Sequence, residues 1–496
     1  MKKIQRVLSL ISVFVLLLGA AAGCGKSDSG DKKVKPGSGK SDEFKVEGAG
    51  KDEYAKYDAK GKVKIAVDTA RPNDYQALFD AFSDVYQNVE LDIDYFAHTT
   101  EDSAQEYLTA KASTGDLPDI VFDEAGPLTL YISQGWVHPI TEFVKNDSTF
   151  ENIPKNLISD YTFGGELYAL PLQATFGGVQ INPDILEKLN LDLPEFDWTP
   201  EDMLTLMKSV TNSEYSAVDG INSMDHWLAA VFGKTCTLQG YDYSKRQFSM
   251  SNSAVKALEY CATLMKLPGV VASTLNMVSN GKNDYELKFG AGDPWENGKL
   301  AFAVDTGTWD STLKRYENCE FYPYPQDKST PGRINVHVDH CFMTTAVKKE
   351  NKEAAFQVLR YLTYSTEGNL ARLSMYTEEN EGVYSLVNDK YYPIVTTNEV
   401  VEMFKSLPSV KKVDIYLLEN IKNGYRADPW KIVPDWYKLR NNYLKDGSNS
   451  IINGTADASA TCKSMENKIN AAMNDAWSSF EAKLKQVQQE FNAANG

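Results

Sequence analysis

The sequence predicts an α/β protein that is built around a parallel sheet and has more than one hydrophobic core. From about residue 61 onward, short strands alternate with amphipathic helices, which is the pattern of a parallel sheet. The chain has 496 residues, whereas single cores stop growing at roughly 250–300 residues. Its composition, 42% hydrophobic and 24% charged, is that of an ordinary globular protein.

Residues 1–23 have the features of an export signal rather than of a folded element. Lys2, Lys3 and Arg6 precede an uncharged, mostly apolar run that ends in small residues before Cys24. The ending Ala-Ala-Gly-Cys resembles the bacterial lipobox, which implies cleavage and a lipid-modified Cys24 that anchors the chain stably in a membrane. An uncleaved apolar anchor is the alternative.

Residues 24–60 are predicted to form a flexible tether. They are rich in Gly, Ser, Lys, Asp and Glu, and this composition cannot bury a core. Residues 36–41, Pro-Gly-Ser-Gly-Lys-Ser, approach a phosphate-binding loop, but Val34 stands where that motif needs its first glycine. No strand is predicted before this stretch and no helix after it, so we interpret it as linker.

The first strand is predicted over residues 63–67, where apolar and polar side chains alternate up to Asp68. Asn73 or Asp74 can cap the helix that follows. Ligands of parallel sheets bind beyond the carboxyl ends of the strands, so Asp68 to Arg71 and Asp123 to Pro127 are predicted to border a site. The next predicted elements are a helix over 75–86, a strand over 91–95, a helix over 102–113 and a strand over 117–122.

The remainder of the chain is less regular until its end. Residues 176–340 mix strands with turns and aromatic residues, and residues 354–364 predict a helix. A long helix is predicted over 461–493, because apolar residues recur every three or four positions from Met465 to Phe491. One face of this helix should pack on the body of the protein, with docking of a partner as the alternative.

Charge and missing motifs exclude several classes of function. The formal net charge is −17, from 51 basic and 68 acidic residues, so the surface repels phosphate backbones and we expect no nucleic-acid partner. The nucleophile elbow, the His-Glu-x-x-His motif and the dinucleotide fingerprint are missing from the sequence, so we expect no enzyme and no cofactor. His337, Asp339 and His340 could ligate a metal, but residues 334–338 alternate like a strand and we expect no metal site.

Beyond Cys24 the chain has five cysteines, and none of them forms a Cys-x-x-Cys pair. Five is an odd number, so at least one thiol is free or pairs between chains. We expect most of them to be small buried hydrophobes.

Several tryptophans are candidates for sugar binding, since sugars need flat aromatic rings for their C–H faces and planar polar groups for their hydroxyls. Trp309 lies in a polar turn after a strand predicted over 301–304, and Trp227 follows His226 at a predicted helix start. Trp436 and Arg440 are four residues apart and share one face of a helix. Core packing is the alternative for each ring. Trp295 is predicted to be a core residue, whereas Trp136 and Trp430 are undecided.

Four further motifs follow the lipobox in order along the chain. They are Gly-Asp-Leu-Pro-Asp-Ile-Val at 115–121, Gly-Trp-Val-His-Pro-Ile-Thr at 135–141, Leu-Tyr-Ala-Leu-Pro at 167–171 with 179–186, and Asn-Gly-Lys-Leu-Ala-Phe at 297–302 with 307–309. Together they resemble the motifs of the family 1 extracellular solute-binding proteins of ABC importers. The resemblance implies two α/β lobes joined by crossing strands, with a hinge between the lobes. It implies a first lobe of residues 61–174 plus 341–372 and a second lobe of residues 175–340 plus 373–496.

The same resemblance implies a monomeric, lipid-anchored receptor on the extracellular face of a bacterial cell membrane. Such a receptor captures a sugar and delivers it to an ABC permease without covalent chemistry. An exported glycan-acting hydrolase, or a binder of a polyamine, a peptide or an anion, is the alternative. Compared with the maltodextrin-binding type, the loop after Phe122 has lost an aromatic residue and charges, and Thr175 replaces a carboxylate. The ligand-binding residues that we predict are Trp309, Trp436, Arg440, Trp227, His226, Tyr437, Asp68, Arg71, Asp123 and Glu124.

Overall fold

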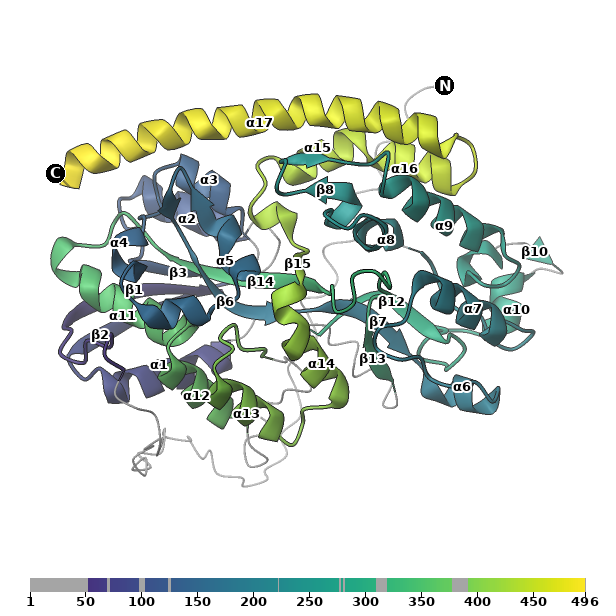
Figure 1. Ribbon diagram of the computed structural model, residues 1–496, viewed down its shortest axis with the longest axis horizontal. Helices are drawn as coiled ribbons and strands as arrows, with labels where there is room; N and C mark the ends of the chain where they lie inside the picture. The colour runs from purple at the N-terminus through teal and green to yellow at the C-terminus, as the bar shows by residue number, and fades with distance from the viewer. Residues whose placement is uncertain are drawn as a thin grey trace, which may run out of the picture. The chain divides into compact units, whose positions relative to one another are not determined.

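The computed structural model describes residues 52–68, 72–97, 103–123, 126–221, 223–275, 278–279, 282–308, 319–376 and 391–495. The predicted export signal and most of the predicted tether, with Cys24, lie outside these residues. Within the described part, helices surround a six-stranded and a three-stranded sheet (Figure 1). None of the helices described is long and apolar enough to cross a membrane.

Three parallel strands form one side of the six-stranded sheet. β1 pairs in parallel with both β2 and β3, and the connections between these strands contain α1 and α2. This confirms the predicted alternation of strands and helices. α1 packs on the sheet because Tyr75, Leu78, Phe79 and Phe82 recur at helical spacing and are all buried. The bounds are β1 (Gly61–Asp68), α1 (Pro72–Val85), β2 (Val89–Phe96), α2 (Ser103–Ser113) and β3 (Ile120–Asp123).

The other strands of this sheet come from distant parts of the chain, so the sheet is mixed rather than wholly parallel. β14 (Asn335–Met343) runs antiparallel to β3 and also antiparallel to β6 (Leu170–Thr175). β15 (Tyr425–Arg426) pairs in parallel with β14. The chain therefore leaves the first sheet along β6 and returns to it along β14.

The second sheet begins directly after β6. β7 (Gly177–Ile181) is its central strand, between the antiparallel partners β12 (Phe302–Gly307) and β13 (Glu320–Pro323). A Cβ atom at Gly178 would lie 2.2 Å from the carbonyl oxygen of Tyr322, so β7 and β13 can approach only because this residue is glycine. Each sheet thus forms the centre of one lobe.

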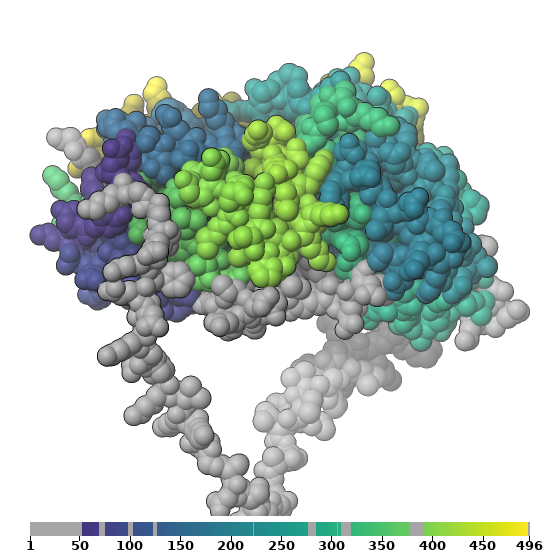
Figure 2. Space-filling model, turned by 60° about the horizontal axis from the view of Figure 1, so that its bottom comes forward, coloured from purple at the N-terminus to yellow at the C-terminus, as the bar shows by residue number. Residues whose placement is uncertain are grey.

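Helices cover the second sheet and lie beside β6 and β14, the strands along which the chain passes between the two sheets. α7 starts with a capping box, in which Thr199 and Asp202 satisfy each other's backbone N–H groups. Figure 2 shows α13 and α14, in yellow-green, between the purple and blue surface of the first lobe and the teal surface of the second. The helices are α6 (Pro183–Lys188), α7 (Pro200–Val210), α8 (Met224–Phe232), α9 (Ala254–Lys266), α10 (Asp284–Phe289), α11 (Lys352–Thr363), α12 (Thr366–Ser374), α13 (Asn398–Ser406), α14 (Lys412–Asn420), α15 (Trp436–Tyr443) and α16 (Lys445–Ile452).

Shorter elements complete the fold. The C-terminal helix contacts two short hairpins, β4–β5 and β8–β9. Residues 52–60, at the end of the predicted tether, contact α11 through an ion pair of 2.7 Å between Asp52 and Arg360. The short elements are α3 (Leu128–Ser133), α4 (Thr141–Val144), α5 (Lys155–Ile158), β4 (Thr162–Phe163), β5 (Glu166–Leu167), β8 (Tyr241–Asp242), β9 (Gln247–Phe248), β10 (Val278–Ser279) and β11 (Lys282–Asn283).

The chain ends in α17 (Ala458–Asn495), a helix of 38 residues. Its predicted apolar positions from Met465 to Leu484 are buried against the body, which confirms the predicted packed face. The predicted helix over 354–364 is also confirmed, as α11. All five cysteines of the described chain are free, and all but Cys319 are buried, as expected for small hydrophobes.

Candidate functional site

Two of the predicted site residues end neighbouring strands of the first sheet. Asp68 is the last residue of β1 and is buried, and Asp123 is the last residue of β3. Because β1 and β3 are parallel, both residues lie at the same edge of the sheet. Arg71, Glu124 and Trp309, the other predictions for strand ends, lie outside the described residues.

α8 and α15 bring two predicted site residues together. Nη2 of Arg440 lies 3.1 Å from Nε2 of His226, and the same imidazole nitrogen lies 3.7 Å from Oδ1 of Asp225. A guanidinium, an imidazole and a carboxylate therefore follow one another in space. All of these groups are planar and can form directional hydrogen bonds with hydroxyls.

The backbone is strained where both of these helices begin. Ser223 before α8 has φ 58° and Asp435 before α15 has φ 55°, so both adopt the left-handed conformation that residues with a side chain seldom adopt. Such a conformation costs of order 1–3 kcal/mol and is often found at binding sites. In this protein it orients the first turns of the helices that contain His226 and Arg440.

A row of half-buried rings lies next to α15. Trp430, in the short 3₁₀ helix η9 (Pro429–Lys431), stacks on Tyr437 with a centroid distance of 6.1 Å and an interplanar angle of 24°. His337 of β14 is tilted against Trp430, with a centroid distance of 5.8 Å and an interplanar angle of 48°. We call His337, Trp430 and Tyr437 the aromatic platform. Each ring keeps part of its surface exposed, as a stacking surface for a ligand requires.

The sequence predicted only Tyr437 among these rings. Trp430 was undecided, although it lies in the segment Asp-Pro-Trp-Lys, where a proline interrupts regular structure and leaves a large ring in a turn. His337 was considered only as a metal ligand. Among the described residues, no three His, Cys, Asp or Glu side chains form a group that could hold a metal ion.

A cavity of about 330 Å³ adjoins the platform. This volume is at the lower end of the range for small-molecule sites. The cavity lies between α3 of the first lobe and the segment η9–α15, and α17 contributes a further wall. Its lining includes Trp430, Trp436, Tyr437, Pro127, Thr129 and Lys483.

Trp227 and Trp436 pack more deeply than a purely ligand-facing ring would. Trp227 is 1% exposed and stacks on Tyr324, with centroids 4.2 Å apart and planes 8° apart. Trp436 is 4% exposed and lies against Tyr241 and Phe248. Both rings therefore stabilise the core of the second lobe, and their roles in ligand binding remain predictions. The predicted core position of Trp295 is confirmed, since that ring is buried.

A buried ionic network holds the backbone next to Trp430 and His337 of the platform in place. Asp428 accepts a hydrogen bond from the Val338 N–H at 2.9 Å and forms ion pairs with Arg426 and, at 3.2 Å, with Lys431. Lys431 also pairs with Asp339 at 2.7 Å. Burial alone would raise the pKa of Asp428, but the charges of Arg426 and Lys431 outweigh burial and hold that pKa well below its ordinary value.

The histidine of the platform is neutral at physiological pH. Burial lowers the pKa of His337 to about 4, because its surroundings solvate the charged imidazolium poorly. His337 therefore presents an uncharged ring beside Trp430, with one nitrogen as a donor and the other as an acceptor.

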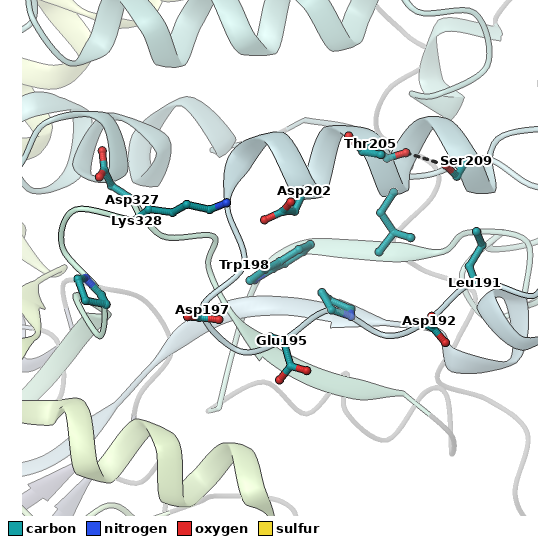
Figure 3. A pocket seen from close by; sticks show the side chains of 13 residues that line it. Leu191, Asp192, Glu195, Asp197, Trp198, Asp202, Thr205, Ser209, Asp327 and Lys328 are labelled. Carbon is teal, nitrogen blue, oxygen red and sulfur yellow. Dashed lines mark hydrogen bonds between the residues drawn. The ribbon is translucent and has the colours of Figure 1, made fainter.

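A larger cavity, of about 810 Å³, lies on the second lobe beside α7 and away from the predicted residues (Figure 3). Much of its polar lining already has local partners. Asp202 binds Thr199 in the capping box, Asp327 binds the Ser329 N–H at 2.7 Å, and Nε1 of Trp198 donates to the Pro323 carbonyl at 2.9 Å. We therefore place the candidate site at the platform and at the Arg440–His226 pair.

Comparisons with known proteins agree with this architecture. A family model described as "bacterial extracellular solute-binding protein" matches residues 55–378. A sugar transporter of Rhizobium etli, solved in an open conformation, is 18% identical with a TM-score of 0.62, and the match covers 83% of this chain and 99% of that one. The sugar-binding protein MalE of Xanthomonas citri is 12% identical with a TM-score of 0.61, over 85% and 99% of the two chains.

A third solved structure is an ABC substrate-binding protein of Listeria monocytogenes in complex with cycloalternan. It is 15% identical with a TM-score of 0.59, and the match covers 84% of this chain and 99% of that one. At such identities these matches show the fold, and they confirm the predicted two-lobe architecture.

Proposed function

The chain belongs to the family of bacterial extracellular solute-binding proteins, and from this membership we propose that it captures a sugar or oligosaccharide between its lobes and delivers it to an ABC permease. Proteins of this family bind solutes rather than transform them. The single observation that carries the sugar assignment is the half-buried aromatic platform beside the Arg440–His226 pair.

The chemistry of this arrangement suits a sugar. The flat rings of Trp430 and Tyr437 can stack on the C–H face of a pyranose, while the planar groups of Arg440 and His226 can bind its hydroxyls. The similar structures from Rhizobium etli and Xanthomonas citri are a sugar transporter and a sugar-binding protein, and the Listeria protein holds cycloalternan. These names support the same class of ligand for this chain.

We propose the site residues as a set that spans both lobes. The first lobe contributes strand-end residues and the second lobe contributes α8, α15 and the loop after β12. The set comprises Asp68, Arg71, Asp123, Glu124, His226, Trp227, Trp309, Trp436, Tyr437 and Arg440, with Trp430 and His337 added from the structure.

The predicted lipid anchoring at the membrane is part of the same proposal. A lipid on Cys24, a palmitate among its chains, would hold a monomeric receptor at the extracellular face of the cell membrane. The lobe boundaries, 61–174 plus 341–372 and 175–340 plus 373–496, are proposed as well. α11, which contacts β6 and β14 in the first sheet, supports the return of the chain at 341–372. β14 joins that sheet already at Asn335, and β15 adds residues 425–426 to it, so the structure extends the first lobe at these two places.

A thermal-shift screen of the exported chain against a panel of glycans tests the proposal. A glycan at 100 times its Kd should raise the free energy of unfolding by about 2.7 kcal/mol, because it binds only the folded protein. A panel that raises the melting temperature with none of its glycans would contradict the sugar assignment. Release of reducing ends from a glycan would favour the hydrolase instead.

Trp430→Ala should weaken glycan binding about fivefold, because the lost ring stacking is worth of order 1 kcal/mol. Isothermal titration calorimetry measures the change. Trp136→Ala is the matched control, since Trp136 is also half-buried and stacks on a tyrosine, Tyr131, at 6.1 Å but does not line the platform. Equal losses from the two variants would mean that Trp430 acts only through general stability.

A further inference from the structure

α17 attaches to both lobes along its length (Figure 1). With 38 residues at 1.5 Å per residue it is about 57 Å long. No glycine or proline occurs between residues 458 and 495, so the helix lacks the usual causes of a kink. We therefore treat α17 as one stiff rod.

The rod is fixed to the second lobe by directional contacts at Asn470, Trp477 and Glu481. The side-chain amide of Asn470 donates to the Phe248 carbonyl at 2.9 Å and accepts from the Phe248 N–H at 2.7 Å, which closes the edge of the β8–β9 hairpin. Arg246 of the same hairpin pairs with Glu481 at 2.6 Å and lies 4.1 Å from the ring of Trp477. Charge and paired hydrogen bonds make this attachment specific.

The C-terminal half contacts the first lobe mainly through apolar surface. Phe480 meets Phe163 of the β4–β5 hairpin edge-on at 5.2 Å, and Phe491 meets His138 edge-on at 4.7 Å. The hydrogen bonds from Gln488 to the first lobe are long: its Nε2 donates to the Gly164 carbonyl at 3.4 Å and to the Tyr168 hydroxyl at 3.2 Å. Apolar contacts have no preferred direction, so this attachment can slide or separate more easily than the first.

Packing is loose where the helix passes from one lobe to the other. The cavity of about 330 Å³ lies beside Phe480, and a second cavity of about 200 Å³ borders the same ring. The second cavity is lined by Phe163 of the first lobe and Arg246 of the second. Space at this junction allows the lobes to move relative to each other without breaking a packed core.

We propose that α17 is a strap that limits separation of the lobes, anchored on the second lobe and released from the first when the lobes open. Two-lobe binding proteins open and close by hinge rotation. A stiff rod that is attached to both lobes cannot follow such a rotation unless one attachment yields. The apolar contacts with the first lobe, at Phe480, at residues 484–491 and at α3, assign the yielding to that side. A strap of this kind would also slow the release of a bound ligand, and that consequence rests on the proposed function. The restricted separation of the lobes does not rest on it.

Single-molecule FRET tests the strap in the ligand-free protein. Dyes are attached through clickable unnatural residues at Ala110 of α2 and Lys208 of α7, both exposed, so the native cysteines stay in place. In the triple variant Leu484→Ala/Gln488→Ala/Phe491→Ala the population with separated lobes should at least double. The matched triple variant Gln486→Ala/Gln489→Ala/Glu490→Ala, on the exposed face of the same turns, should leave the distribution unchanged.

An unchanged distance distribution in the folded triple variant would overturn the strap. If that variant does not fold, Phe491→Ala alone replaces it, because this half-buried residue lies near the end of the helix; a smaller broadening is then expected, and no broadening refutes the proposal. The FRET measurement needs no glycan, so its failure leaves the proposed function intact. A negative glycan screen, in turn, would overturn the function and not the strap. With a glycan bound, the triple variant should release it several-fold faster.

Discussion

Asp428→Ala should lower the free energy of unfolding by about 3–5 kcal/mol. Asp428 is 0% exposed and is the shared partner of Arg426 and Lys431. Its removal leaves the buried Arg426 without its ion-pair partner and Lys431 with Asp339 alone, and it also leaves the Val338 N–H without its acceptor. Urea unfolding at pH 7 measures the loss.

Asp116→Asn is the control for this change. Asp116 also forms an ion pair, with Lys64 at 2.7 Å, but both side chains are about half exposed. Exposed ion pairs are screened by solvent and contribute little, so this variant should leave the free energy of unfolding nearly unchanged. Comparable losses in the two variants would show that the buried network does not stabilise the fold.

The same substitution should also weaken ligand binding. Asp428 and Lys431 flank Trp430 in the chain, and Val338 follows His337. The ionic network thus fixes the backbone on both sides of two platform rings. A platform ring that can tilt loses part of its stacking energy, so glycan affinity should fall even in the fraction of Asp428→Ala molecules that stays folded.

The local fold of the first lobe was accessible from sequence because its signals are local. Alternation over residues 63–67 and helical periodicity over 75–86 depend only on neighbours, and β1 and α1 form there. The mixed sheet was not accessible in this way. β14 joins β3 from more than 200 residues away. The alternation of side chains in β14 is the same whether a strand pairs in parallel or antiparallel, so it does not reveal the direction of this pairing.

The site was harder to predict, because exposure of a ring depends on what tertiary structure places against it. Trp227 and Trp436 have polar neighbours in sequence, yet Tyr324 and Phe248 cover them. Trp430 keeps an open surface, and the proline before it is the only local sign that this ring lies in a turn. The resemblance placed Arg440 and His226 separately among the site residues, but neither it nor any local pattern predicted that they pair across 214 positions.

Acidification from pH 7 to pH 5 should cost about 2 kcal/mol of unfolding free energy through His340 alone. Its ring is 0% exposed, neither nitrogen has a hydrogen-bond partner in the described structure, and burial lowers its pKa from 6.5 to about 3. Between these two pH values the unfolded chain binds a proton at this position and the folded chain does not. Stability therefore falls as pH falls through 6.5 and continues to fall toward 3.

His340→Leu tests this linkage. At pH 7 the variant should change the free energy of unfolding by less than about 1 kcal/mol, since it also removes two buried polar atoms without partners. On acidification to pH 5 it should lose about 2 kcal/mol less of that free energy than the parent. Cys341→Ala is the control. Burial raises the pKa of the Cys341 thiol, so it stays protonated throughout this range and its loss should cost the same at both pH values. Parallel pH profiles for the parent and His340→Leu would mean that water or a local opening solvates the charged ring, and that β14 is less tightly closed around His340 than its burial indicates.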